Sequence, residues 1–356
     1  MPFEERSRFE HYPLPIRDNG YVAFAADNPG ARALLRDAIY EVSPSEQMPL
    51  SMRYDDEQQL LRLLSKVQSR LPADQTEGIQ FRITDERDQE ADWSPLPAIF
   101  GEVGGRGVAD TILHRLFTSY MQPIVQKGGE AIGYEFLLRP LPELAPFRPA
   151  TLFEAARRIG QHAFLDRAAR KSAIRMGASH LPNGTKRFIN FLPSSLRQPD
   201  ACLQCTFELM RETGTEAEDY VFEVMETERL DNPSMEHVFD VARSRGVRLA
   251  LDDVGAGFAT LDTVDRLQPD YVKMDRKWVS GCDTDDTKQR YIDRLLNRVS
   301  KFRGTLLAEG VEREEEWSYL RRIGIPLFQG YLFGRASPVP AGNGLMGTSD
   351  LAGVMR

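Results

Sequence analysis

Short apolar segments of strand length recur along most of the chain, and stretches of helical periodicity separate most of them. Each segment is rich in Val, Ile, Leu, Phe or Tyr, which is typical of buried strands. Strand–helix alternation repeated this often predicts parallel strands joined by crossover helices. The predicted strands are residues 119–125, 131–139, 186–193, 220–226, 247–253, 270–275, 304–309 and 326–333. We therefore expect an α/β protein with a TIM-type (β/α)8 barrel, in which the carboxyl ends of the strands meet at one mouth.

The first two strands of this barrel are expected to differ from the rest. A helix near Val108–Phe117 precedes them, and only a Gln-Lys-Gly-Gly-Glu turn separates them. No helix fits into so short a connection, so the two strands should form an antiparallel hairpin. The barrel should therefore contain one antiparallel strand.

Residues 1–83 predict a small α+β domain that precedes the barrel. Two helical faces are formed by Leu34, Leu35, Ala38, Ile39 and Val42, and by Leu60, Leu63, Leu64, Val67 and Leu71. Residues 79–83 alternate like a half-buried strand. The Pro- and Gly-rich segment 84–107 predicts a linker. The barrel then takes residues 108–338, and residues 339–356 form a loosely structured tail. We expect residues 1–83 to be a regulatory domain whose signal cannot be identified from sequence.

Polar residues, most of them acidic, stand at the carboxyl ends of the predicted strands. A single acid in a strand usually faces solvent or pairs with a lysine. Several acids at successive strand ends would crowd into one mouth and repel each other, and divalent cations relieve such repulsion. The oxygen ligands are not accompanied by Cys or His, which indicates Mg²⁺ or Mn²⁺. The acids of this set are Glu135, Glu223, Asp252, Asp253 and Glu309, joined by Asn190.

The bulk composition excludes several other classes of protein. The formal net charge of −8 over 356 residues argues against a surface for nucleic-acid polymers. No apolar run reaches the roughly 18–20 residues that span a membrane, and the N-terminus lacks a signal-peptide core, so we expect a cytoplasmic protein with no membrane partner. Cys202 and Cys205 have the spacing of a metal or redox pair. No second pair accompanies them, which favours reduced thiols.

Five ordered motifs resemble those of the EAL-domain phosphodiesterases, which hydrolyse the bacterial second messenger cyclic di-GMP. They are Glu135-Phe136-Leu137 with Arg139, Asp252-Asp253-Val-Gly255-Ala-Gly257-Phe, Lys273-Met-Asp275, Ala308-Glu309-Gly-Val-Glu312 and Gln329-Gly-Tyr-Leu-Phe-Gly334. The resemblance covers roughly residues 108–338. It implies a metal-dependent phosphodiesterase that opens cyclic di-GMP to linear pGpG. It also implies two Mg²⁺ or Mn²⁺ ions in each active site and a homodimer.

The resemblance also implies a role for each matching residue. Glu135, Asn190, Glu223 and Asp252 would hold the first metal, and Asp252 would bridge to a second one that Asp253 and Glu309 also hold. Glu309 is at the same time the expected general base. Lys273 would orient the attacking water or the scissile phosphate, although it could instead be an inward lysine paired with Asp275. The expected substrate-binding residues are Gln122, Leu138, Arg139, Asp275 and Gln329.

Several of these roles have structural alternatives. Arg139 lies four residues after Glu135, so both side chains should share a strand face, but it could form a salt bridge at the barrel rim instead of binding a phosphate. Gln122 and Gln329 could be hydrogen-bonded residues of the barrel floor. Glu312 is expected to support the metal site from just outside it.

The segment that follows Asp252 is a candidate mobile loop. Gly255 and Gly257 allow positive φ there, and the resemblance implies that the loop contacts Glu226 and couples dimerisation to metal binding. This loop departs from the family pattern at Val254, Ala256, Phe258 and Ala259, which puts the turnover rate and regulation in question. Phe136 replaces a smaller residue, and it should point away from the mouth because it alternates with Glu135.

Two other functions stay open at this point. The chain could be a catalytically weak EAL-type receptor that binds cyclic di-GMP and signals through its N-terminal part. It could also be a barrel enzyme for an unrelated phosphorylated metabolite. The complete set of acids favours the phosphodiesterase.

Overall fold

The computed structural model describes residue 13 and residues 15–39, 49–71, 75–86, 91–192, 199–224, 233–256 and 261–340. The chain divides into two compact units. The first contains Met1–Thr118 and Arg139–Ala168, and the second contains Ser119–Leu138 and Ala169–Arg356. Within the part of the chain that the structure describes, no helix is long and apolar enough to cross a membrane.

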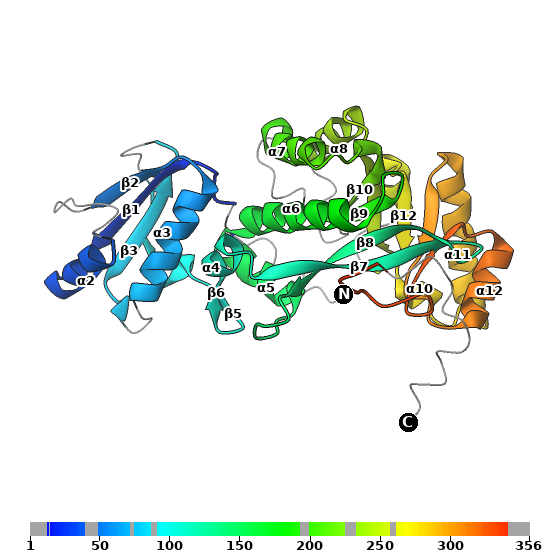
Figure 1. The fold of residues 1–356 in the computed structure, drawn as a ribbon, viewed down its shortest axis with the longest axis horizontal. Helices are drawn as coiled ribbons and strands as arrows, with labels where there is room; N and C mark the ends of the chain where they lie inside the picture. The colour runs from blue at the N-terminus through cyan, green and yellow to red at the C-terminus, as the bar shows by residue number, and fades with distance from the viewer. Residues whose placement is uncertain are drawn as a thin grey trace, which may run out of the picture. The chain divides into compact units, whose positions relative to one another are not determined.

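The first unit contains a four-stranded antiparallel sheet in the order β2-β1-β3-β4. Helices α2 and α3 pack against each other and against this sheet, as the blue part of Figure 1 shows. The expected α+β class of the N-terminal part is therefore confirmed. The elements are β1 (Gly20–Ala26), α2 (Pro29–Ile39), β2 (Leu50–Tyr54), α3 (Glu57–Arg70), β3 (Ile79–Thr84) and β4 (Ser94–Pro95).

The two predicted apolar faces belong to α2 and α3. All five residues predicted for the second face are buried, and Leu61 joins them. Asp56 starts α3, because its side chain accepts a hydrogen bond from the backbone N–H of Gln59 at 2.8 Å. Leu34 is a correction to the first face: it is 39% exposed, whereas Ala31 takes the buried position one turn earlier. Val42 lies outside the described residues.

The first unit also includes short elements outside the four-stranded sheet. They are η3 (Leu96–Ile99), β5 (Glu102–Val103), β6 (Arg106–Gly107), α4 (Val108–Leu113), α5 (Pro149–Arg158) and the start of α6 (His162–His180). Thus the described part of the segment predicted as a linker contains β4, η3, β5 and β6. The buried Arg167 of α6 forms two ion pairs at 2.7 Å, with Asp18 and with Glu57 of α3. These pairs join α6 to the N-terminal domain within this unit.

Eight strands close into the predicted barrel. Strand β7 runs antiparallel to β14, whereas each pair of neighbouring strands from β8–β9 to β13–β14 is parallel. The single antiparallel strand and the hairpin are therefore confirmed. The strands are β7 (Phe117–Gln126), β8 (Ala131–Pro140), β9 (Lys186–Phe191), β10 (Tyr220–Val224), β11 (Arg248–Val254), β12 (Tyr271–Met274), β13 (Thr305–Ala308) and β14 (Leu327–Gln329).

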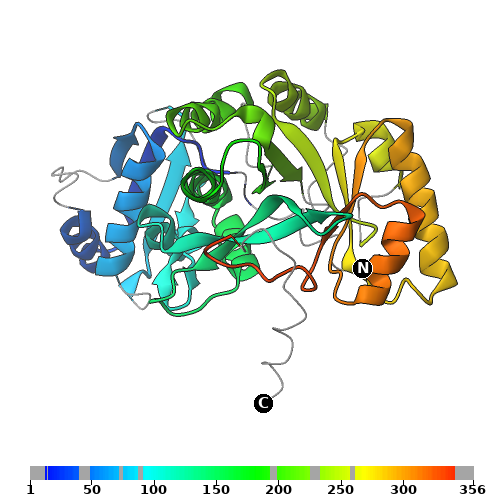
Figure 2. The same ribbon diagram turned by 45° about the vertical axis from the view of Figure 1, so that its right-hand side comes forward.

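Helices cover the outside of these strands, as the yellow and orange helices in Figure 2 show for β12 to β14. The remaining elements are α7 (Pro199–Glu212), η5 (Ala217–Asp219), α8 (Pro233–Ser244), α9 (Leu261–Leu267), α10 (Arg276–Val279), α11 (Asp286–Lys301) and α12 (Glu314–Ile323). The larger apolar core lies between strands and helices. Phe136 is buried in this outer core at 3% exposure, as expected. Gly177 of α6 makes room for its ring, because a Cβ there would lie 3.0 Å from the ring edge.

A second, smaller core fills the inside of the barrel. Its members come from successive strands and point inward, so they form an apolar floor beneath the mouth. They are Ile124, Phe188, Val221, Ala250, Tyr271, Leu307 and Leu327. Because side chains alternate along a strand, the residue two positions further toward the mouth also points inward. The identity of those residues decides what the barrel can bind.

Candidate metal and active site

The predicted site residues form the next inward layer above the apolar floor. On the parallel strands each lies two positions after a floor residue, and on the antiparallel β7 it lies two positions before one. The layer consists of Gln122, Asn190, Glu223, Asp252, Lys273, Glu309 and Gln329, with Glu135 added by β8. The structure thus brings residues from all eight strands or strand ends to one place, and every one of them was predicted from sequence.

Lys273 lies at the centre of this layer and is completely buried. Its Nζ lies 2.7 Å from Glu309 Oε1, 2.8 Å from Glu223 Oε1, 2.9 Å from Asp252 Oδ1 and 3.5 Å from Glu135 Oε2. Burial alone would lower the pKa of Lys273, but these four carboxylates raise that pKa well above its ordinary value. The lysine therefore stays charged and partly neutralises the cluster.

Two of the carboxylates have strongly perturbed pKa values. Burial raises the pKa of Glu223 well above its ordinary value, and the opposing effect of Lys273 does not cancel it. The pKa of Glu309 is raised for the same reason, with Asp252 and Glu135 adding like charge. The Glu309 side chain is nevertheless 16% exposed, whereas that of Glu223 is 0% exposed. Glu309 is therefore the acid of this pair that water can reach.

The acids form two groups that share Asp252. Glu135, Glu223 and Asp252 can place one oxygen each within 4.8 Å of one another, and so can Asp252, Asp253 and Glu309. Among the described residues Glu223 Oε2 has no hydrogen-bond partner although it is buried. Such an oxygen is costly unless something coordinates it. An all-oxygen ligand set with an unpaired buried carboxylate oxygen fits a hard divalent cation such as Mg²⁺ or Mn²⁺.

Two side-chain amides donate hydrogen bonds to Glu135. Gln329 Nε2 donates a 2.6 Å hydrogen bond to Glu135 Oε2, and Asn190 Nδ2 donates a longer one, of 3.4 Å, to Oε1. Gln329 Nε2 also lies 3.3 Å from Gln122 Oε1, and Gln122 Nε2 donates to the carbonyl of Gly334 at 3.3 Å. Gln329 is thus bonded directly to a metal-ligand candidate, and Gln122 is linked to it through Gln329, so neither serves only as a floor residue.

The turn after β11 is held from α10 and α11. Asp253 and Gly255 have φ values of +51° and +94°. Trp278 Nε1 donates to the carbonyl of Gly255 at 3.1 Å, and the indole stacks on Tyr291 with ring centres 3.7 Å apart. We did not predict Trp278 or Tyr291 from sequence. The only available signal was that an aromatic residue follows Lys273-Met-Asp275 by three positions.

Two predicted residues at the mouth contact neighbours other than the acids. The Asp275 side chain accepts from the backbone N–H of Lys277 at 3.0 Å and so caps α10. The ion pairs of Lys273 are with the four carboxylates, so the alternative pairing of Lys273 with Asp275 is not what the structure shows. Glu312 accepts a hydrogen bond from Arg276 at 3.0 Å.

Of the four remaining predicted residues, two lie near the end of β8 and two lie outside the described residues. Leu138 and Arg139 lie near the end of β8, three and four residues beyond Glu135, and both are half-buried. Glu226 and Gly257 lie outside the described residues. The role expected for the loop that contains Gly257 therefore stays a prediction.

An eight-stranded α/β barrel whose mouth carries two acidic groups able to hold a metal ion defines the class of this protein. Residues 107–336 match the family model described as the EAL domain, and the chain belongs to this family. It is 31% identical over 227 residues to the probable cyclic di-GMP phosphodiesterase PdeG of Escherichia coli K12, an alignment that covers 60% of this chain and 43% of PdeG. It is 25% identical over 284 residues to the cyclic di-GMP phosphodiesterase PdeL of the same organism, covering 74% and 78% of the two chains.

Solved structures show the same fold. A standalone versatile EAL protein from Vibrio cholerae O395, in its c-di-GMP-bound form, is 28% identical with a TM-score of 0.58, over 64% of this chain and 95% of that one. Klebsiella pneumoniae BlrP1, in a complex with manganese and cy-diGMP, is also 28% identical with a TM-score of 0.58, over 62% and 56%. The chain spans less than half the length of its first curated relatives.

Proposed function

We propose that this chain is a metal-dependent phosphodiesterase that hydrolyses cyclic di-GMP to linear pGpG. The observation that carries the proposal is the pair of acidic groups that share Asp252 at the barrel mouth. The names of relatives such as PdeL and the ligands of the solved EAL structures identify the substrate class that suits such a site.

The charge of the site supports two divalent cations. The two groups contain five carboxylates, and Lys273 is the cation at their centre. If all are ionised, four negative charges remain, which is the charge that two divalent ions would balance. We propose that Glu135, Asn190, Glu223 and Asp252 hold one ion, and that Asp252, Asp253 and Glu309 hold the other. When bound, such ions polarise a phosphodiester and lower the pKa of a water.

The side chains can carry out the other parts of the reaction. Glu309, the most exposed of the four carboxylates around Lys273, would accept a proton from the attacking water. The ammonium of Lys273, held 2.7 Å from Glu309, would orient that water and stabilise the negative charge that develops on the phosphate. Because Lys273 is fixed by ion pairs on several sides, it needs no reorganisation during the reaction.

Substrate binding is assigned to residues around this centre. We propose that Gln122 and Gln329 donate or accept hydrogen bonds with the substrate, since their amides already meet beside Glu135. Arg139 would bind a phosphate with both guanidinium nitrogens. Leu138 and Asp275 would contact the rest of the dinucleotide.

The test uses the purified full chain with cyclic di-GMP, and chromatography to detect pGpG. We expect pGpG with Mg²⁺ or Mn²⁺, none in excess chelator, and inhibition by Ca²⁺, which prefers longer bonds and more ligands. Binding of cyclic di-GMP without any pGpG would make the chain a receptor and refute the enzyme assignment. Full turnover in excess chelator would refute the metal-dependent mechanism.

Assembly and location complete the proposal. We propose a cytoplasmic homodimer in which the loop around Gly257 and its contact with Glu226 couple the interface to the second metal ion. Glu226→Ala should then lower activity without removing a metal ligand. A strictly monomeric and fully active protein in analytical ultracentrifugation would contradict this assembly.

A further inference from the structure

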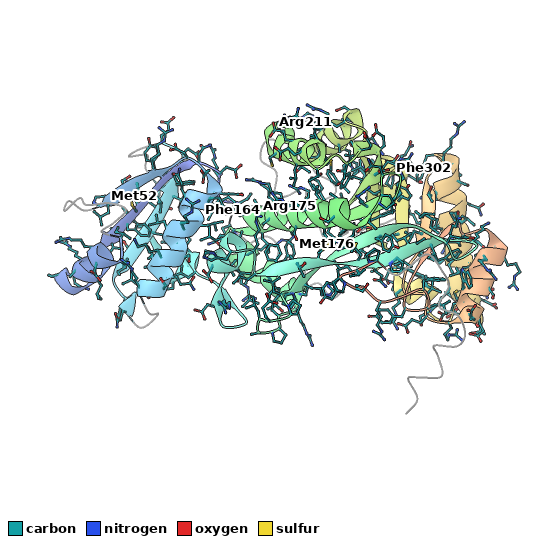
Figure 3. All side chains as sticks on the ribbon, in the orientation of Figure 1. Met52, Phe164, Arg175, Met176, Arg211 and Phe302 are labelled. Atoms are coloured by element: carbon teal, nitrogen blue, oxygen red, sulfur yellow. The ribbon has the colours of Figure 1, made fainter. Side chains whose placement is uncertain are left out.

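A second concave site lies in the first unit and shares no residue with the acidic layer of the barrel. It is a cavity of about 260 Å³ between the edge strand β2 and helix α3, near the Met52 side chain that Figure 3 labels. Its lining consists of Val22, Met52, Arg53, Tyr54, Gln59, Arg62, Leu63 and Lys66. Nothing in the proposed reaction uses these residues.

One face of α3 supplies half of this lining. Gln59, Arg62, Leu63 and Lys66 follow the i, i+3, i+4, i+7 spacing, so they lie along one side of the helix. The adjacent face packs against the sheet through Leu60, Leu64 and other buried residues. The cavity therefore lies where the apolar face of α3 gives way to its polar face, beside the open edge of the sheet.

The charged residues among the eight that line this cavity are all basic. Arg53, Arg62 and Lys66 contribute three cations, and none of the eight lining residues is acidic. The chain as a whole has a net charge of −8, so a local group of cations without acids departs from its average surface. Arg53 forms an exposed ion pair with Asp55 at 2.7 Å, and such pairs contribute little. A bound anion could accept charge-assisted hydrogen bonds from these basic side chains.

The floor of the cavity is apolar. Val22 is fully buried, and Leu63, Met52 and Tyr54 are 5%, 9% and 2% exposed. Cations above an apolar floor match a ligand that has a charged group and a hydrophobic body. The volume is below the roughly 300–1,000 Å³ that is typical of drug-sized ligands, so the ligand should be smaller than a cyclic dinucleotide.

We propose that this cavity binds a small organic anion, in which a phosphate or carboxylate contacts Arg62 and Lys66 and a compact apolar body contacts Met52 and Leu63. Helix α3 would carry the effect of binding, because its other contacts lead to α6 and α4 of the same unit. Glu57 pairs with Arg167 of α6, and Ser65 donates a hydrogen bond to Asp110 of α4 at 3.2 Å. The site would thus supply an input for a regulatory N-terminal domain.

The test is isothermal titration calorimetry on the full chain without metal and without cyclic di-GMP, so its outcome does not depend on the activity of the barrel. The probes are phenyl phosphate and benzoate, which distinguish the two anion types, with inorganic phosphate and phenol as the separate halves of the ligand. We expect saturable binding of at least one organic anion, and binding at least about tenfold weaker for phenol and inorganic phosphate. Added salt should weaken the binding.

Matched variants locate the site. R62Q combined with K66Q should weaken binding by about tenfold or more, because it removes two charge-assisted contacts. R106Q makes the same change on an exposed strand of the same unit outside the cavity, and it should bind like the unaltered chain. The ¹³C-methyl resonance of Met52, assigned with Met52→Leu, should shift during the titration and stay unchanged in the double variant. The proposal is overturned if neither organic anion binds, if inorganic phosphate binds as tightly as phenyl phosphate, or if the double variant binds normally.

Discussion

Gly255→Ala should change the geometry of the second acidic group, Asp252, Asp253 and Glu309, while all three carboxylates stay present. Gly255 follows Asp253 by two residues and has φ of +94°, which L-residues rarely adopt. A Cβ on Gly255 would lie 2.3 Å from Tyr291 Oη and 2.4 Å from Trp278 Nε1. Either these two aromatic side chains or the turn that carries Asp253 must therefore move.

The magnitude follows from three local costs. A non-glycine residue in the left-handed region costs about 1–2 kcal/mol. Loss of the Trp278–Gly255 hydrogen bond costs about 1 kcal/mol, and disturbance of the Trp278–Tyr291 stack costs about 0.5–1.5 kcal/mol. We therefore expect destabilisation of roughly 2.5–4.5 kcal/mol. If the turn relaxes instead, Asp253 shifts, and misplacement by about 1 Å can reduce turnover by about 10²-fold.

Gly324→Ala is the matched control. Gly324 has a similar φ of +105°, but a Cβ there meets no atom within 4 Å, so this variant isolates the backbone cost. The measurements are pGpG formation, the metal concentration for half-maximal turnover, metal affinity by calorimetry and the free energy of unfolding. We expect weaker metal binding and slower turnover only for Gly255→Ala, with about 1–2 kcal/mol of destabilisation for the control. Normal metal affinity and turnover in Gly255→Ala would refute the view that this turn positions Asp253.

Glu135→Ala should abolish pGpG formation while circular dichroism shows an intact fold. Glu309→Gln should reduce turnover by about 10²–10⁴-fold, because an amide cannot act as a base. The control is Glu314→Gln, which changes an exposed glutamate, and a near-normal rate in either test variant would refute the role assigned to that residue. Burial and the charge of a nearby arginine lower the pKa of the buried His162 to about 4. Because an unfolded histidine titrates near 6.5, this group should destabilise the protein by about 3 kcal/mol as the pH falls from 6.5 to 4, and His162→Gln should show a shallower loss in denaturant titrations over that range. Burial raises the pKa of the fully buried Cys282 to about 12, so Cys282→Ser should leave the number of thiols labelled by Ellman's reagent in the native protein unchanged. We propose that residues 1–83 are a separable regulatory domain, so a chain that starts at Val103 should be soluble and hydrolyse cyclic di-GMP; aggregation without activity would contradict this.

The sequence by itself determined the class of the barrel and the acids of its mouth. Period-two alternation shows which side chains face inward, and the short connection before Ala131 can only join antiparallel strands. The order of the motifs then places Glu223, Asp252 and Glu309 at strand ends. These inferences rest on local patterns, which sequence displays directly.

Only the tertiary structure decided what these side chains contact. Closure of the barrel brings Gln329 next to Glu135, 194 residues earlier, and places Lys273 among four carboxylates instead of beside Asp275. No periodicity encodes which strand ends meet, because neighbours across a closed sheet are set by strand order and register.

Contacts elsewhere in the molecule could not be predicted from local sequence patterns either. The stack of Trp278 and Tyr291 on the turn at Gly255 joins α10, α11 and β11, and it has no local signature. Leu34 fits the apolar face of α2 by spacing, yet the sheet covers only the neighbouring side of the helix. Periodicity shows that a helix has an apolar face, whereas the width of that face depends on the elements that pack against it.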